Sequence, residues 1–209
     1  MRSVMKSRLS KPEPSHIQIE REIAVSRASS IFQIKLDGET YAMKLYHDNG
    51  DPGYTESGRD LNRYRCELKA YMNLLQYGVC DSGLVPSCYG YIDRLDPDAA
   101  ILLEYFSTAE CLNCFNYSGA LYKMAIEGMK QIHKAHIHHM DIYARNILLV
   151  TEGRSKRLVW VDFDVATTFD SMGPDEEAYN IYEDTLVAGL EELLQEDQRQ
   201  GLPLNSAFY

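Results

Sequence analysis

A short hairpin expected in the second half of the chain constrains the fold more than any other feature. Its second strand contains the apolar run Leu158–Val161, which ends directly at Asp162. An apolar run of this kind is typical of a buried strand, and a carboxylate at its end is costly without a partner. The chain must therefore fold so that Asp162 meets a ligand.

Composition narrows the class of protein. The 209 residues include 21 Lys and Arg against 31 Asp and Glu, for a net charge of −10. This acidic balance argues against a nucleic-acid partner, because phosphate contacts need clustered basic side chains. No apolar run approaches the roughly 18 residues that span a bilayer. The N-terminus lacks the apolar segment of a secretory signal, so we expect an intracellular protein without a membrane partner.

The first half of the chain has mainly the period-two pattern of strands. Residues 1–16 are expected to form a flexible tail. Strands are predicted at Ile17–Val25, Ile31–Leu36 and Thr40–Tyr46, with a turn at Asp37-Gly38, and at Cys88–Ile92 and Ala100–Phe106, with a turn at Asp96-Pro97-Asp98. Between them, a loop at His47–Arg59 precedes a helix that starts near Asp60, buries Leu61, Tyr64, Leu68, Tyr71 and Leu75, and ends at Gly78.

Helical periodicity dominates the second half. A long helix is expected to bury Leu121, Met124, Met129 and Ile132, and a hairpin follows at Asn146–Val150 and Arg157–Asp162. A last helix over Glu177–Glu196 carries Ile181, Tyr182, Leu186, Leu190 and Leu193 on one face. The pattern predicts an α+β protein.

Two polar motifs flank the hairpin. His139-Met-Asp141-Ile-Tyr-Ala-Arg-Asn146 resembles the catalytic loop H-x-D-x-x-x-x-N of the protein-kinase-like superfamily, and Asp162-Phe163-Asp164 resembles its metal-binding D-F-G. Four weaker matches occur in the expected order: the strand Tyr41–Lys44, Glu67 on the next helix, the hinge-like segment Ile101–Phe106, and the helix around Asp184. The chain is most similar to the short kinase-like proteins of filamentous fungi that carry H-x-D-I-x-x-R-N and D-F-D.

This resemblance implies a bilobal protein-kinase-like fold. Residues 17–106 would form the N-lobe, a five-stranded antiparallel sheet with one helix, and the hinge; residues 107–209 would form a truncated, mainly helical C-lobe. The implied cofactors are ATP and Mg²⁺. The implied catalytic residues are Asp141, Lys44 and Asn146, the nucleotide-binding residues are Lys44, Glu67, Glu104, Phe106 and Asp162, and the metal ligands are Asn146 and Asp162. Asp184 would brace the catalytic loop, and His139 would support it.

Three features depart from the superfamily pattern. The turn before Lys44, residues Ser26–Ile31, contains no glycine, which restricts how closely a phosphate can approach its backbone. Asp164 replaces the glycine of D-F-G and would either face solvent or limit the flexibility of that segment. The part after Asp164 lacks A-P-E and most of the helices that seat a peptide.

Three functional hypotheses remain open at this point. The first is a phosphotransferase that uses ATP and Mg²⁺ and acts on a hydroxyl of a protein or a small molecule. The second is a weak or inactive pseudokinase that binds nucleotide or protein. The third is a metal or redox site built on Cys111 and Cys114 with His133 and His136, although five cysteines at this density are more typical of buried free thiols.

Overall fold

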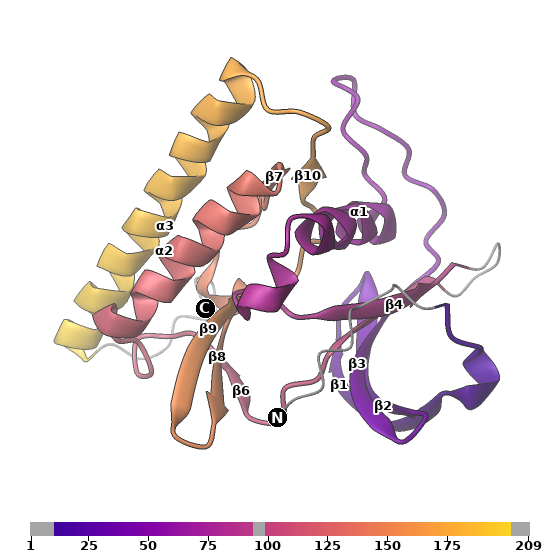
Figure 1. Cartoon of the computed structure of the whole chain (residues 1–209). Coiled ribbons are helices and arrows are strands. Elements are labelled where there is room, and N and C mark those ends of the chain that lie inside the picture. The colour runs from indigo at the N-terminus through magenta and orange to yellow at the C-terminus, as the bar shows by residue number, and fades with distance from the viewer. Residues whose placement is uncertain (1–10, 94–98, 202–209) are drawn as a thin grey trace.

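The computed structural model describes residues 11–93 and 99–201, and this part of the chain is α+β (Figure 1). Within it, the first half forms a five-stranded antiparallel sheet in the order β1-β2-β3-β5-β4. The strands are β1 (Gln18–Val25), β2 (Ser29–Leu36), β3 (Glu39–Tyr46), β4 (Cys88–Ile92) and β5 (Ala99–Glu104). The predicted sheet is confirmed. The predicted turn at Asp96-Pro97-Asp98 and residues 1–10 of the predicted tail lie outside the described residues, and Pro14–His16 forms a short 3₁₀ helix.

The turn between β2 and β3 shows why these strands pair as they do. Asp37 and Gly38 both have positive φ values, 52° and 86°, and they join Leu36 directly to Glu39 across the ladder. A two-residue turn of this kind matches the natural twist of a hairpin. The resulting register places Lys44 of the central strand β3 between Ile31 of β2 and Ile101 of β5.

Helix α1 (Arg63–Gln76) begins later than the sequence predicts. The side chain of Asn62 accepts a hydrogen bond from the Arg65 amide at 3.0 Å and caps the helix at this point. Leu61 therefore precedes the helix and is 40% exposed, so its predicted place on the buried stripe is wrong. Tyr71, by contrast, is fully buried as predicted.

The second half contains two long helices that lie side by side (Figure 1). Its elements are β6 (Ala109–Cys111), α2 (Gly119–Lys134), β7 (Ile137–His138), β8 (Ile147–Glu152), β9 (Ser155–Trp160), β10 (Thr167–Thr168) and α3 (Pro174–Gln200), with short 3₁₀ helices at Cys80–Ser82 and Ala144–Asn146. Strand β8 pairs with β6 and β9, and β7 pairs with β10. Met129 and Ile132 of α2 are buried as predicted, while the short pair β7–β10 is too brief to give a sequence signal.

Helix α3 buries a different face from the predicted one. Leu190 is buried as expected, but Ile181, Tyr182, Leu186 and Leu193 are exposed, and the residues that face the core are Glu183, Val187, Leu190 and Leu194. This second set has the helical spacing of one stripe. A buried glutamate interrupts its apolar pattern, so periodicity alone favours the wrong face.

One hydrophobic core connects the helices to the hairpin β8–β9. Trp160 of β9 is fully buried, and its indole Nε1 donates to the carbonyl of Ala125 in α2 at 2.8 Å. Tyr71 of α1 packs against Phe163 with ring centroids 5.6 Å apart. This core fixes the segment after β9 against both α1 and α2. No helix in residues 11–93 or 99–201 is long and apolar enough to cross a membrane.

The contact between α2 and Trp160 gives a stability prediction. A Cβ atom at Gly128 of α2 would lie 2.7 Å from Trp160 Cδ1, whereas a Cβ at Gly189 of α3 would meet nothing within 4 Å. Gly128→Ala should destabilise the protein by about 1 to 3 kcal/mol through overpacking. Gly189→Ala should stabilise it by up to about 1 kcal/mol through helix propensity. Urea denaturation measures both, and a Gly128→Ala variant as stable as Gly189→Ala would contradict this packing.

Candidate active site

The side chain of Lys44 joins three separate elements of the fold. Its Nζ lies 2.6 Å from Glu67 Oε2 of α1 and 2.5 Å from Asp162 Oδ1, which follows β9. Asp164 Oδ2 is 3.8 Å away. The structure thus brings together the predicted residues Lys44, Glu67 and Asp162 in one ion-pair cluster. The side chains of Lys44 and Glu67 are only 6% and 1% exposed, whereas that of Asp162 is 41% exposed.

The charged groups of this cluster shift one another's pKa values. Burial alone would lower the pKa of Lys44, but the carboxylates of Glu67, Asp162 and Asp164 more than offset it and raise that pKa. Burial raises the pKa of Glu67. Lys44 acts in the opposite direction, and so does the hydrogen bond that the Tyr46 hydroxyl donates to this carboxylate. Burial would raise the pKa of Asp162 too, but Lys44 lowers it. Lys44 therefore stays charged.

The predicted catalytic loop brings Asp141 and Asn146 into direct contact. Asn146 Nδ2 donates to Asp141 Oδ2 at 2.7 Å and to the Asp141 carbonyl at 2.9 Å. Asn146 is buried in a 3₁₀ turn before β8, and the Asp141 side chain remains partly exposed. These bonds fix the orientation of the Asp141 carboxylate and direct Asn146 Oδ1 away from it.

Glu183 of α3 braces this loop, and the prediction that Asp184 does so is wrong. Glu183 is 1% exposed, and its carboxylate accepts from the amides of His139 at 3.2 Å and Met140 at 2.7 Å. His133 Nε2 of α2 lies 2.9 Å from the same carboxylate. Asp184 is 44% exposed and only approaches His133, at 3.6 Å. The motif of the superfamily has an aspartate at this place, so the resemblance points to Asp184. The buried face of α3 instead contains Glu183, together with Val187, Leu190 and Leu194.

Aromatic packing holds the loop against the segment after β9. The buried ring of His139 lies 4.8 Å from Phe163, centroid to centroid, and its Nε2 is 3.0 Å from the Val161 carbonyl. Burial lowers the pKa of His139, so the neutral ring is favoured. Met140 and Asp162 both have φ of 68°, a left-handed conformation that is unfavourable for such residues. Strain of this kind is typical of functional sites.

Asp164 neither faces solvent nor lies free beside the cluster. It is buried, and its Oδ2 accepts from Arg63 Nη1 of α1 at 2.8 Å. The carboxylate that replaces the expected glycine thus ties this segment to the first turn of α1.

The predicted hinge residues lie apart from the cluster. Glu104 pairs with Tyr41, three positions along β3 from Lys44. Its carboxylate accepts from Arg157 at 2.9 Å and from the Ser87 amide at 3.2 Å. The Arg157 guanidinium also lies over the Phe106 ring at 5.1 Å. The Glu104 side chain is therefore directed to Arg157 and not toward Lys44.

The oxygen atoms at the predicted metal position suit a hard cation. Mg²⁺ is usually held by one or two protein oxygens together with phosphates and water, and Asn146 Oδ1 and the Asp162 carboxylate provide such oxygens. Among the described residues, no group of three or more His, Cys, Asp or Glu side chains is arranged to hold a metal by itself. Cys114 is buried, Cys111 is exposed, and His133 is engaged by Glu183.

Comparison with known families decides the class of this site. The model of the lipopolysaccharide kinase (Kdo/WaaP) family matches residues 66–172, a range that includes Glu67, Asp141, Asn146 and Asp162. The chain belongs to the lipopolysaccharide kinase (Kdo/WaaP) family. The site is thus that of a kinase-like phosphotransferase. No curated protein matches the chain. The finer resemblance to fungal kinase-like proteins stays a prediction.

The brace on the catalytic loop of this Kdo/WaaP-family chain can be tested by matched substitutions. Glu183→Ala leaves the amides of His139 and Met140 without their acceptor, which should cost about 3 kcal/mol. Asp184→Asn, at a half-exposed neighbour, should cost less than about 0.5 kcal/mol. Denaturant titration measures both. Equal losses, or a larger loss for Asp184→Asn, would contradict the assigned brace.

The same carboxylate gives a pH dependence. Burial would raise the pKa of Glu183, but hydrogen bonds from His133 and the Met140 amide lower it below its ordinary value of 4.5. A carboxyl group with a lowered folded pKa stabilises the protein above its unfolded pKa, and this contribution is lost as pH falls through the folded value. The stability gap between wild type and Glu183→Ala should therefore be full near pH 7 and shrink below pH 4.5. A gap that widens in acid would contradict this sign.

Proposed function

We propose that the protein is a phosphotransferase that uses ATP and Mg²⁺ and transfers the γ-phosphate to an acceptor hydroxyl. The observation that carries this proposal is the Lys44 cluster, in which Nζ lies 2.6 Å from Glu67 and 2.5 Å from Asp162. A charged, buried lysine held between a helix and a metal-binding carboxylate is suited to bind the α- and β-phosphates.

Asp141 is the proposed general base. In the transfer, the acceptor oxygen forms a bond to the γ-phosphorus, the bond to the ADP oxygen breaks, and the acceptor proton passes to the Asp141 carboxylate. The Asn146 amide holds this carboxylate at 2.7 Å, and its partial exposure leaves room for an acceptor. Fixing the base in this way lowers the entropic cost of reaction.

Asn146 and Asp162 are the proposed metal ligands. When bound, Mg²⁺ would neutralise charge on the β- and γ-phosphates. Asn146 Nδ2 is engaged by Asp141, so its Oδ1 is the atom that would face the cation. Asp162 Oδ1 is paired with Lys44, so Asp162 Oδ2 would be the oxygen that binds the metal.

For the acceptor, we favour a sugar hydroxyl over a peptide. The matching family is described as lipopolysaccharide kinases, and lipopolysaccharide offers sugar hydroxyls. An intracellular location is consistent with the use of ATP.

A second candidate, a pseudokinase that binds nucleotide without turnover, is favoured by one specific observation. The turn Ser26–Ser29 between β1 and β2 lacks the glycines that let backbone amides approach phosphate. Binding with turnover supports the enzyme, and binding without turnover supports the pseudokinase.

Substitution of Asp141 tests the proposed reaction. With Mg²⁺ and ATP, Asp141→Asn should lower the rate of phosphate release or transfer to a panel of sugar and peptide hydroxyls by about a hundredfold or more, because the base is lost. The melting shift induced by ATP should remain, since Asp141 does not contact Lys44. Asp81→Asn, an exposed aspartate in a 3₁₀ turn, is the matched control and should leave both readouts unchanged. An active Asp141→Asn variant would contradict the role of the base.

A further inference from the structure

The turn between β1 and β2 uses most of its own backbone amides. Ser26 Oγ accepts from the amides of Ala28 at 3.1 Å and Ser29 at 3.0 Å, and the Ser26 amide donates to the Ser29 carbonyl at 2.8 Å. These amides are therefore not available to surround a phosphate. If this turn contributes to phosphate binding, a side chain must therefore donate the hydrogen bonds to the phosphate.

Arg27 lies at the tip of this turn in a fixed position. Its carbonyl oxygen is 3.2 Å from His47 Nδ1 and accepts from Asn49 Nδ2 at 3.5 Å, and the Ala28 carbonyl accepts from the His47 amide at 2.9 Å. These bonds attach the tip to the segment after β3. The Arg27 backbone is thereby held while its side chain remains exposed.

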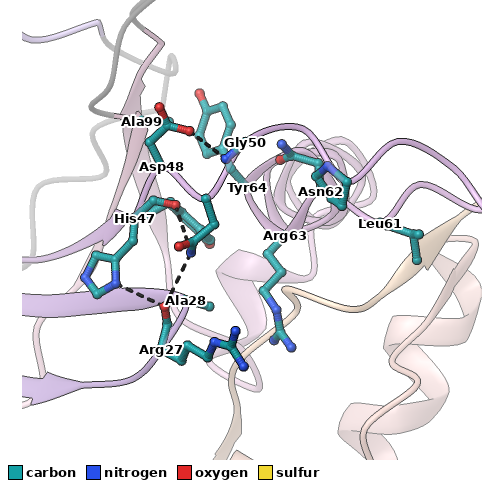
Figure 2. A pocket seen from close by; sticks show the side chains of 13 residues that line it. Arg27, Ala28, His47, Asp48, Gly50, Leu61, Asn62, Arg63, Tyr64 and Ala99 are labelled. Carbon is teal, nitrogen blue, oxygen red and sulfur yellow. Dashed lines mark hydrogen bonds between the residues drawn. The ribbon is translucent and has the colours of Figure 1, made fainter.

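A polar cavity of about 690 Å³ lies between this turn and the start of α1. Figure 2 shows the guanidinium groups of Arg27 and Arg63 extending toward the same part of it. Arg63 Nη1 binds Asp164 at 2.8 Å, and Asp164 is 3.8 Å from Lys44 Nζ. Arg63, which lines the cavity, therefore connects it to the Lys44 cluster through Asp164. The one carboxylate in its lining, Asp48, accepts from the Gly50 amide at 2.9 Å.

The local charge balance distinguishes Arg27 from its neighbours. Other arginines near the site already have partners: Arg63 binds Asp164, Arg65 binds Asp51 and Asp60, and Arg145 lies 3.6 Å from Asp141. Arg59 donates to the Val165 carbonyl at 2.7 Å. Within residues 11–93 and 99–201, Arg27 forms no ion pair with a carboxylate. A phosphate group placed beside Asp162 and Asp164 would meet their negative charges and would need such a cation.

We propose that Arg27 binds the terminal phosphate of the nucleoside triphosphate, with Arg63 beside it, and replaces the missing glycine-rich backbone contact. This inference rests on the proposed function. A guanidinium suits the role because it donates two parallel hydrogen bonds to phosphate oxygens and stays charged at every working pH. The charge of Arg63 is offset by Asp164, so Arg27 is the cation that would meet the third phosphate of ATP, which ADP lacks.

Calorimetric titration with ATP and with ADP, both with Mg²⁺, tests this proposal. Arg27→Ala should weaken ATP binding by about tenfold to a hundredfold and ADP binding much less, because the lost contact is to the terminal phosphate. Arg27→Lys should fall between wild type and Arg27→Ala, since it keeps the charge and loses the second hydrogen bond. Arg154→Ala, an exposed arginine in the turn between β8 and β9, removes the same charge far from the site and should bind as wild type does.

The outcomes separate this inference from the function on which it rests. Wild-type affinity for ATP in Arg27→Ala would overturn the proposal, and so would an equal loss for ATP and ADP. If the wild-type chain binds neither nucleotide, the proposed function itself fails and this inference fails with it. An equal loss of ATP affinity in Arg154→Ala and Arg27→Ala would mean that the loss comes from the change in net charge. That result would also overturn the proposal.

Discussion

Three elements of the fold meet at the ion-pair cluster of Lys44. Its Nζ joins the central strand β3 to helix α1 and to the segment after β9, at 2.6 Å from Glu67 and 2.5 Å from Asp162. Burying charges in this way costs several kcal/mol unless their geometry is well matched. Such a cluster is weak evidence for stability, and clustered ionisable groups with shifted pKa values are typical of active sites.

The surrounding fold serves to hold this cluster in place. Phe163 packs against Tyr71 of α1 and His139 of the catalytic loop, so one aromatic contact network positions both polar motifs. Glu183 of α3 fixes the loop from the other side through the amides of His139 and Met140. The left-handed backbone at Met140 can persist because these contacts determine it on both sides. Helix α3 thus contributes to the site although no part of it approaches Lys44.

Strand alternation predicts the α+β architecture, and the resemblance of the motifs predicts that Glu67 fixes Lys44, because both are local signals in the sequence. The contact between Lys44 and Asp162 is seen only in the structure. The sequence misplaces features that depend on tertiary partners. Leu61 is exposed because Asn62 caps the helix after it, and the buried face of α3 is centred on Glu183, a charged residue that no hydrophobic pattern selects. Asp164 is buried beside two distant cations, Arg63, which is 101 residues earlier, and Lys44.

We propose that the Lys44 cluster is organised for a nucleotide and its metal. Titration of the wild-type chain with ATP, once with Mg²⁺ and once with a chelator, tests this proposal. Because Asn146 and Asp162 would share the metal with the phosphates, ATP should bind at least about tenfold more tightly with Mg²⁺ than without it. An absence of ATP binding, or an affinity that does not change when Mg²⁺ is removed, would contradict this proposal.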